Sequence, residues 1–189
     1  MDIRDKERFA YDGSFPKNKP KERGIIMQTF KFNNGREIPA LGIGTYQIQQ
    51  DDCERSIEAA LRSGYRLIDT ANVYMNEKAV ARGMKKSGVL REKIFLTTKL
   101  WPTSYPYEKA TQAIEDTLKR MVTPYLDLLL LHQEVGDILG AWKAMEEAVD
   151  AGKVNSIGVC NFGEKNLKKL HMKKCQKHYQ QCYQVKQWD

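Results

Sequence analysis

Short apolar runs alternate along this chain with longer segments of helical periodicity, and this alternation constrains the fold more than any other feature. Three of the runs cover residues 66–68, 94–98 and 126–131. Repeated strand–helix units of this kind predict a parallel sheet whose strands are buried on both faces. The sequence therefore predicts an α/β fold with its connections outside the sheet.

Each of the three runs leads into a different ionisable residue. These residues are Asp69, Lys99 and His132, and Tyr74 follows shortly after the first of them. In parallel α/β sheets, functional side chains gather at the carboxyl ends of the strands, where the loops to the helices meet. Taken singly, each residue has a structural explanation, as a helix cap, a polar strand end or a packing aromatic. Their joint arrangement at consecutive strand ends predicts one active site.

The remaining elements follow from turn signals and periodicity. Residues 33–36, Asn-Asn-Gly-Arg between two short apolar segments, predict a β-hairpin. Asp51 or Asp52 is expected to cap the first helix. The expected strands lie at 40–45, 66–71, 94–100, 125–132, 154–159 and 182–187, and the expected helices at 51–63, 76–87, 107–121, 137–151 and from 164 onward. A closed eight-stranded α/β barrel takes about 250 residues, so these units predict an incomplete barrel.

Composition indicates an ordinary globular protein, with 41% hydrophobic and 29% charged residues. No apolar run approaches the roughly 20 residues that span a bilayer, and the first residues do not resemble a signal peptide. We therefore expect no membrane partner. The four cysteines show neither metal-site spacing nor a disulfide framework, so we also expect no metal site and a cytoplasmic location. Residues 1–26, polar and without periodicity, are expected to form a disordered extension.

The net charge of +7 raises the question of a nucleic-acid partner. Residues 165–189 hold seven Lys and one Asp, a local charge of +6, which leaves about +1 for the rest of the chain. The basic character therefore belongs to the tail, and we expect no nucleic-acid partner. A binding module that uses this tail remains a second, weaker hypothesis.

The four candidate side chains together suit the reduction of a carbonyl group. A tyrosine hydroxyl has an ordinary pKa of about 10, and an adjacent ammonium, here Lys99, is expected to lower it. Such a site protonates an oxygen on which negative charge develops. It cannot supply a hydride, so a nicotinamide cofactor is required. No Gly-x-Gly-x-x-Gly follows a predicted strand, and a Rossmann cofactor site is therefore not expected.

Three motifs resemble those of the aldo-keto reductases. They read LIDTANVYMNE at 67–77, TTKLW at 97–101 and IGVCNF at 157–162, and the resemblance runs from about Gln28 to Leu170. It implies a (β/α)8 barrel of the TIM type, closed at its base by an N-terminal hairpin. It also implies reduction of an aldehyde or ketone to an alcohol with NADPH, and a small-molecule carbonyl substrate as the partner. The oligomeric state stays open.

The resemblance assigns a role to each matching position. It implies that Tyr74 is the general acid and that Asp69 and Lys99 lower its pKa. His132 would orient the carbonyl group. The implied cofactor contacts are Gly44, Thr45, Asp69, Asn161 and Gln184, and the implied substrate contacts are Tyr46, Trp101 and His132. Cys160 stands where the family usually has Ser, and we interpret it as a small buried residue.

No segment matches the seventh and eighth strands of the family, which makes an inactive, truncated reductase the main alternative. The match also breaks at 171–182 and resumes at 183–186, YQVK, which resembles the family segment Asn-Gln-Val-Glu. Read from the third base of the His171 codon, a permitted back-translation gives the family-like YEEMPKTLPAV. We therefore hypothesise two compensating frame changes around 171 and 182; the alternative is a divergent surface helix.

Overall fold

The computed structural model describes residues 28–32, 34–172 and 183–184 of the chain. The expected extension at 1–26 lies outside these residues, as does nearly all of the segment at 171–182. The described strands are β1 (Thr29–Lys31), β2 (Glu37–Pro39), β3 (Gly42–Gly44), β4 (Leu67–Asp69), β5 (Phe95–Leu100), β6 (Leu128–Leu131), β7 (Ile157–Cys160) and β8 (Tyr183–Gln184). The α-helices are α1 (Gln50–Arg62), α2 (Glu77–Ser87), α3 (Tyr107–Met121), α4 (Ile138–Asp150) and α5 (Glu164–Met172), and the 3₁₀ helices are η1 (Asn72–Tyr74), η2 (Arg91–Lys93) and η3 (Pro102–Ser104).

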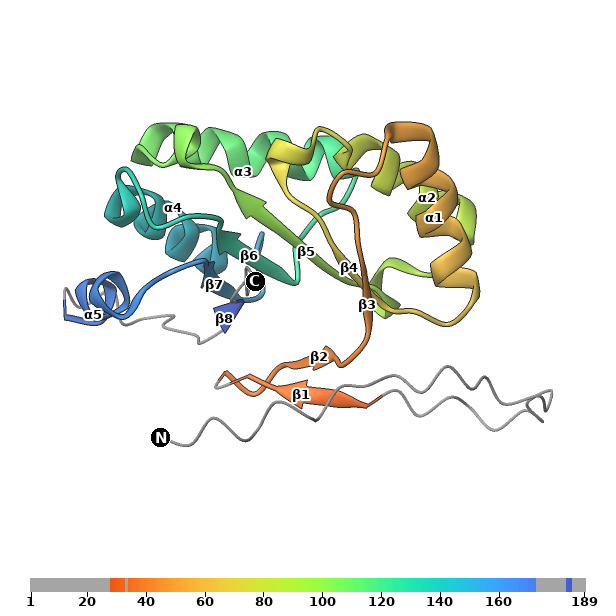
Figure 1. The fold of residues 1–189 in the computed structure, drawn as a ribbon, viewed down its shortest axis with the longest axis horizontal. Coiled ribbons are helices and arrows are strands. Elements are labelled where there is room, and N and C mark those ends of the chain that lie inside the picture. Colours follow the sequence, from red (N-terminus) through yellow and green to blue (C-terminus); the bar gives the residue numbers. More distant parts are fainter. Residues whose placement is uncertain (1–27, 33, 173–182, 185–189) are drawn as a thin grey trace.

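Strands β3 to β8 form one parallel sheet in the order of the sequence, and Figure 1 shows helices α1 to α4 along its outer side. Each strand pairs with its successor, for example Gly44 opposite Asp69 and Lys99 opposite Leu130. This curved sheet, with a helix after each of strands β3 to β7, confirms the predicted α/β fold and a partial barrel. The carboxyl ends of all its strands therefore meet at one end of the molecule.

Strand β6 shows why the apolar runs carry no polar alternation. All four of its leucines are buried. Leu129 and Leu131 belong to the large core between the sheet and the helices, whereas Leu128 and Leu130 belong to a smaller cluster on the inner face. Side chains of a strand alternate between the two faces, so a strand covered on both sides must be apolar throughout.

The predicted hairpin is confirmed and lies across the lower end of the sheet in Figure 1. Gly35 adopts a φ of +84°, a conformation that glycine tolerates best. Phe32 packs edge-on against Phe95 at the start of β5, with ring centroids 6.1 Å apart, and Asn34 donates a hydrogen bond to Ser156 at 3.0 Å. The hairpin therefore covers the amino-terminal ends of the strands, opposite the predicted site.

The prediction that Asp51 or Asp52 caps helix α1 is wrong. The helix begins at Gln50 after Gln49, and no side chain caps it. The carboxylate of Asp52 instead pairs with Arg55 one turn further on. Asp51 and Asp52 lie in the first turn of the helix, where negative charge is favourable because the helix dipole is positive at that end. The two acids thus stabilise the helix start without capping it.

Helix α3 is followed by Val122, its C-cap, which adopts a left-handed conformation with φ +49° and ψ +50°. A β-branched residue is strained there, and the side chain is 84% exposed, so little packing compensates. We expect Val122→Gly to raise the free energy of unfolding by about 0.5–1 kcal/mol in urea denaturation. Val122→Ala, which keeps a Cβ atom, should raise the free energy of unfolding by less. An equal increase in both variants, or a decrease in Val122→Gly, would contradict this interpretation.

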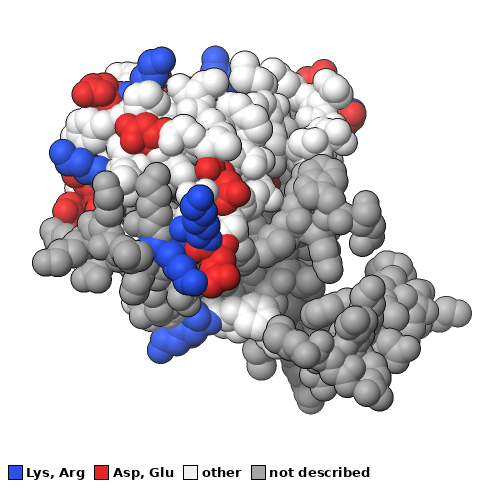
Figure 2. All heavy atoms as spheres, turned by 60° about the vertical axis from the view of Figure 1, so that its left-hand side comes forward, with Lys and Arg blue, Asp and Glu red and all other residues white. Residues whose placement is uncertain are grey.

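Charges of both signs lie side by side on the face that Figure 2 shows. Among the described residues, exposed side chains of opposite charge also pair along helices, for example Lys168 with Glu164 and Lys143 with Glu147. An interspersed surface produces no broad field of one sign, which is what attraction of a polyanion requires. No helix among the described residues is long and apolar enough to cross a membrane.

Candidate active site

The alternation along β4 and β5 directs two of the predicted residues to the inner face of the sheet. In β5, Leu96 and Leu100 pack toward the helices, so Lys99 shares the inner face with Phe95. In β4, Ile68 packs toward the helices, which places Asp69 on the inner face as well. The two side chains therefore meet between adjacent strands, at the carboxyl end.

Asp69 and Lys99 form an ion pair in which Lys99 is nearly completely buried. The Nζ atom donates to Asp69 Oδ1, and it also donates to the carbonyl oxygen of Thr70 at 3.1 Å. The Lys99 side chain is 2% exposed and that of Asp69 is 27% exposed. A buried ammonium is costly unless it is paired and hydrogen-bonded, and these two acceptors offset the cost of burying Lys99.

Tyr74 lies above this pair, at the end of the 3₁₀ turn η1. The Lys99 Nζ atom is 5.6 Å from the centre of its ring. The turn is closed by Met75, whose φ of +58° is unusual for a residue with a side chain. This reversal of the chain returns the half-buried Tyr74 ring toward the ion pair.

The expected lowering of the pKa of Tyr74 is wrong for this structure. Burial, and to a smaller extent the nearby charge of Asp69, raise the pKa of Tyr74 to about 12. The physical reason is that Asp69 neutralises Lys99, so the phenol faces an ion pair rather than a lone ammonium. Tyr74 therefore stays protonated throughout the neutral range, which is the form that can donate a proton.

Three aromatic side chains lie at or near the Tyr74 ring. The ring of Tyr46 lies 5.2 Å from that of Tyr74, and the ring of His132 lies 5.7 Å from it at an interplanar angle of 76°. Trp101 packs edge-on against His132 at 5.0 Å. The structure thus brings together the four predicted catalytic residues and both aromatic residues expected at the substrate.

The predicted cofactor residues differ in what their side chains do. Gly44 ends β3 with no other atom within 4 Å of the place a Cβ would take, so its backbone is open to a ligand. Thr45 is fully buried; its hydroxyl donates to Thr70 at 2.8 Å, its backbone N–H donates to Asp69 and its carbonyl oxygen accepts from Asn76, so it supports the end of β3 from within. Gln184 lies in β8 opposite Cys160, which places its backbone beside the end of β7.

Asn161 holds the loop that carries His132. Its Nδ2 atom donates to the carbonyl oxygen of His132 at 2.9 Å and to Cys160 Sγ at 3.2 Å. Cys160 is buried in the inner cluster with Leu128 and Leu130, which agrees with its interpretation as a small buried residue. The amide of Asn161 thus ties the ends of β6 and β7 together at the site.

Sequence reasoning assigned no role to three polar side chains that support the site. Glu77 is 2% exposed; it accepts from Thr98 at 2.9 Å and from Arg120 at 2.7 Å. The Tyr105 hydroxyl is fully buried and bonds both backbone groups of Gln133, directly after His132. Asn76, next to Glu77, is equally buried. Asn76 and Glu77 lie within the motif at 67–77, whereas no pattern pointed to Tyr105.

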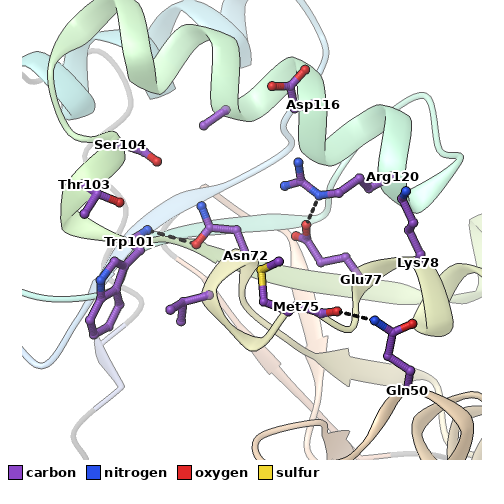
Figure 3. Close-up of a pocket in the computed structure, with 12 residues that line it drawn as sticks. Gln50, Asn72, Met75, Glu77, Lys78, Trp101, Thr103, Ser104, Asp116 and Arg120 are labelled. Atoms are coloured by element: carbon purple, nitrogen blue, oxygen red, sulfur yellow. Dashed lines mark hydrogen bonds and ion pairs between the residues drawn. The ribbon is translucent and has the colours of Figure 1, made fainter.

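A separate cavity of about 640 Å³ lies behind the site, between η1, η3, α2 and α3. Figure 3 shows Arg120 and Glu77 paired across it, and Asn72 accepting a hydrogen bond from the backbone of Trp101 at 3.2 Å. Neither Tyr74 nor Lys99 lines this space. Trp101 separates it from His132, so the cavity is a neighbour of the candidate site rather than the site itself.

Comparison with known proteins supports one family. The sequence profile of the aldo/keto reductase family matches residues 40–186. Morphine 6-dehydrogenase of Pseudomonas putida is 43% identical over 141 residues, 73% of this chain and 48% of that protein. Glyoxal reductase of Bacillus subtilis (strain 168) is 40% identical over 147 residues, 77% of this chain and 53% of that protein. The chain thus spans about half the length of these two relatives.

The fold is similar to that of solved structures in the same family. The crystal structure of an aldo/keto reductase from Brucella melitensis has a TM-score of 0.81 at 36% identity, and the match covers 85% of this chain and 63% of that chain. The range matched by the family profile includes residues 171–182. The frame-change hypothesis for those residues stays a prediction.

Proposed function

The chain belongs to the aldo/keto reductase family, and we propose that its site reduces an aldehyde or ketone to the alcohol with NADPH. The observation that carries the proposal is the buried Asp69–Lys99 ion pair beneath the ring of Tyr74, with His132 5.7 Å from that ring. Four side chains from three neighbouring strand ends thus surround a position for one polar group. A carbonyl oxygen that gains negative charge suits this position.

Tyr74 is the proton donor in this proposal. Its raised pKa keeps the hydroxyl protonated at neutral pH, and the buried ammonium of Lys99 favours negative charge on the phenolic oxygen once the proton has left. Asp69 fixes the position of Lys99. His132 would donate a hydrogen bond to the carbonyl oxygen and so orient it, with Tyr46 and Trp101 as the aromatic walls for the substrate.

The cofactor supplies the hydride, which no side chain of the site can provide. The open backbone at Gly44 fits a ligand that approaches the end of β3 closely. Gly44, Asp69 and Asn161 would hold the nicotinamide end, with Gln184 beside them in β8 and the buried Thr45 supporting the end of β3. These residues line the mouth of the partial barrel, where the substrate walls also lie.

The first test measures NADPH binding by cofactor fluorescence on purified residues 1–189, followed by oxidation of NADPH with glyoxal, chosen after the Bacillus subtilis relative. With cofactor deuterated at C4, we expect deuterium in the alcohol product by mass spectrometry. Binding together with transfer of the label supports the proposal. A cooperatively folded chain that binds no NADPH would instead favour the alternative of an inactive reductase-related chain.

The second hypothesis, a basic binding module, depends on residues that the structure mostly leaves undescribed. In α5, which the structure describes, Lys168 pairs with Glu164, so the charge of this lysine is offset locally. RNA affinity that falls steeply with salt would favour this hypothesis, because each phosphate contact releases counterions. Binding that is absent or insensitive to salt would remove it.

A further inference from the structure

Asn76 stands at the N-cap of α2, yet its side chain does not cap that helix. An asparagine in this position commonly accepts a hydrogen bond from a backbone N–H of the first turn. The Nδ2 atom of Asn76 instead donates to the carbonyl oxygens of Thr45 at 2.9 Å and Ile48 at 3.2 Å. The side chain therefore ties α2 to the segment between β3 and α1.

The oxygen of the same amide completes a small buried network. Oδ1 accepts from the hydroxyl of Thr70 at 3.1 Å and lies 3.4 Å from that of Thr45, which itself donates to Thr70 at 2.8 Å. The side chains of Asn76, Thr45 and Thr70 are at most 1% exposed. Both donors and the acceptor of the amide are used, so an aspartate of the same shape would lose two bonds and repel two carbonyl oxygens.

The two segments joined by Asn76 each carry a tyrosine of the candidate site. Residues 45–48 carry Tyr46, and the turn directly before Asn76 carries Tyr74; the two rings are 5.2 Å apart. Figure 3 shows a second tie, in which Gln50 donates to the carbonyl oxygen of Met75 at 3.3 Å. Met75 has a φ of +58°, and such a conformation persists where surrounding contacts enforce it.

The network also reaches the buried ammonium. The Thr70 hydroxyl donates to Asn76, and the Thr70 carbonyl accepts from Lys99 Nζ at 3.1 Å. Asn76 itself contacts neither Tyr46, Tyr74 nor Lys99 through its side-chain hydrogen bonds. It can act on the site only by fixing the backbone segments that carry these residues.

We propose that Asn76 is a positioning residue that holds Tyr46 against Tyr74 and so fixes the aromatic wall beside the proton donor. The effect on catalysis rests on the proposed function. Because the acid itself is retained, loss of Asn76 should impair the fit of the substrate more than the proton transfer. Misplacement of catalytic groups by about 1 Å can cost a hundredfold in rate.

The test compares Asn76→Asp with Asp127→Asn in the full chain. Asp127 also accepts partly buried hydrogen bonds, from Arg91 and from the backbone of Leu96, but at the opposite end of the sheet. For Asn76→Asp we expect kcat/KM to fall by about 30- to 100-fold, mostly through a higher KM. For Asp127→Asn we expect a lower melting temperature with an unchanged KM. If Asn76→Asp does not fold, Asn76→Ser, which introduces no charge, takes its place.

A second measurement is independent of turnover. In tyrosine-labelled protein, the nuclear Overhauser effect between the rings of Tyr46 and Tyr74 should be lost in the Asn76 variant and kept in Asp127→Asn. An Asn76 variant that keeps both this signal and the KM, and loses only stability, would overturn the proposal. If the wild type shows no turnover, the proposed function fails, and the ring contact still decides whether Asn76 positions the two tyrosines.

Discussion

Replacing Lys99 with methionine is expected to lower kcat/KM for carbonyl reduction by about 10³-fold and the free energy of unfolding by about 3 kcal/mol. Methionine fills a similar volume but leaves the carboxylate of Asp69 without the ammonium that it faces. The pKa of Tyr74, already raised by burial and by Asp69, should rise further, because negative charge would no longer be offset. Steady-state kinetics and urea denaturation measure the two effects.

Lys153→Met is the matched control for this variant. Lys153 also forms an ion pair, with Glu115, but their side chains are 41% and 35% exposed, and the pair lies away from the candidate site. An exposed ion pair contributes about 0–1 kcal/mol to the free energy of unfolding. We therefore expect a small loss of stability and unchanged kinetics. Similar stability losses in both variants, or activity retained in Lys99→Met, would contradict the role given to the buried pair.

Arg91→Ala is expected to cause the largest loss of stability, about 3–5 kcal/mol, without changing the KM of the protein that remains folded. The guanidinium of Arg91 donates to the hydroxyl of Thr123, to the carboxylate of Asp127 and to two backbone carbonyls. It also stacks on the ring of Tyr125, 4.2 Å from its centre. Removing it takes a hydrogen bond from each of these partly buried acceptors at the amino-terminal end of the sheet, of which Tyr125 and Asp127 keep other donors.

Arg82→Ala provides the comparison for Arg91. Arg82 pairs with Glu54 across α1 and α2, but its side chain is 46% exposed and Lys86 contacts the same carboxylate. We expect a loss below about 1 kcal/mol in urea denaturation. Comparable losses of unfolding free energy in the two variants would show that the number of hydrogen bonds around Arg91 contributes little to stability.

Sequence patterns located the elements that depend on local signals. Helix α3 begins and ends as predicted, because periodicity and the Tyr107 start after a proline define it locally. Strands β4 and β6 are shorter than the strands predicted at 66–71 and 125–132. At the start of the β6 run, Leu126 forms only an isolated bridge with Val154, since a run signals burial and not the length of pairing.

The site was predicted as a set of residues but not as an electrostatic environment. The strand ends of Asp69, Lys99 and His132 follow from the βα pattern, and the structure brings them together. The pKa of Tyr74 could not be predicted, because it depends on how deeply the ring is buried and on the pairing of Lys99. The role of Asn76 could not be predicted either, because its hydrogen-bond partners lie 28 and 31 residues away in the sequence.

The proton donor is the centre of this account, and a single-turnover measurement tests it most directly. Wild type, Tyr74→Phe and Tyr65→Phe would be mixed with glyoxal at saturating NADPH; Tyr65 is an exposed tyrosine at the opposite end of β4. The account predicts that Tyr74→Phe lowers the rate of NADPH oxidation by about 10²–10⁴-fold with NADPH binding intact, and that Tyr65→Phe changes neither. A Tyr74→Phe protein that binds NADPH and turns over at the wild-type rate would contradict it.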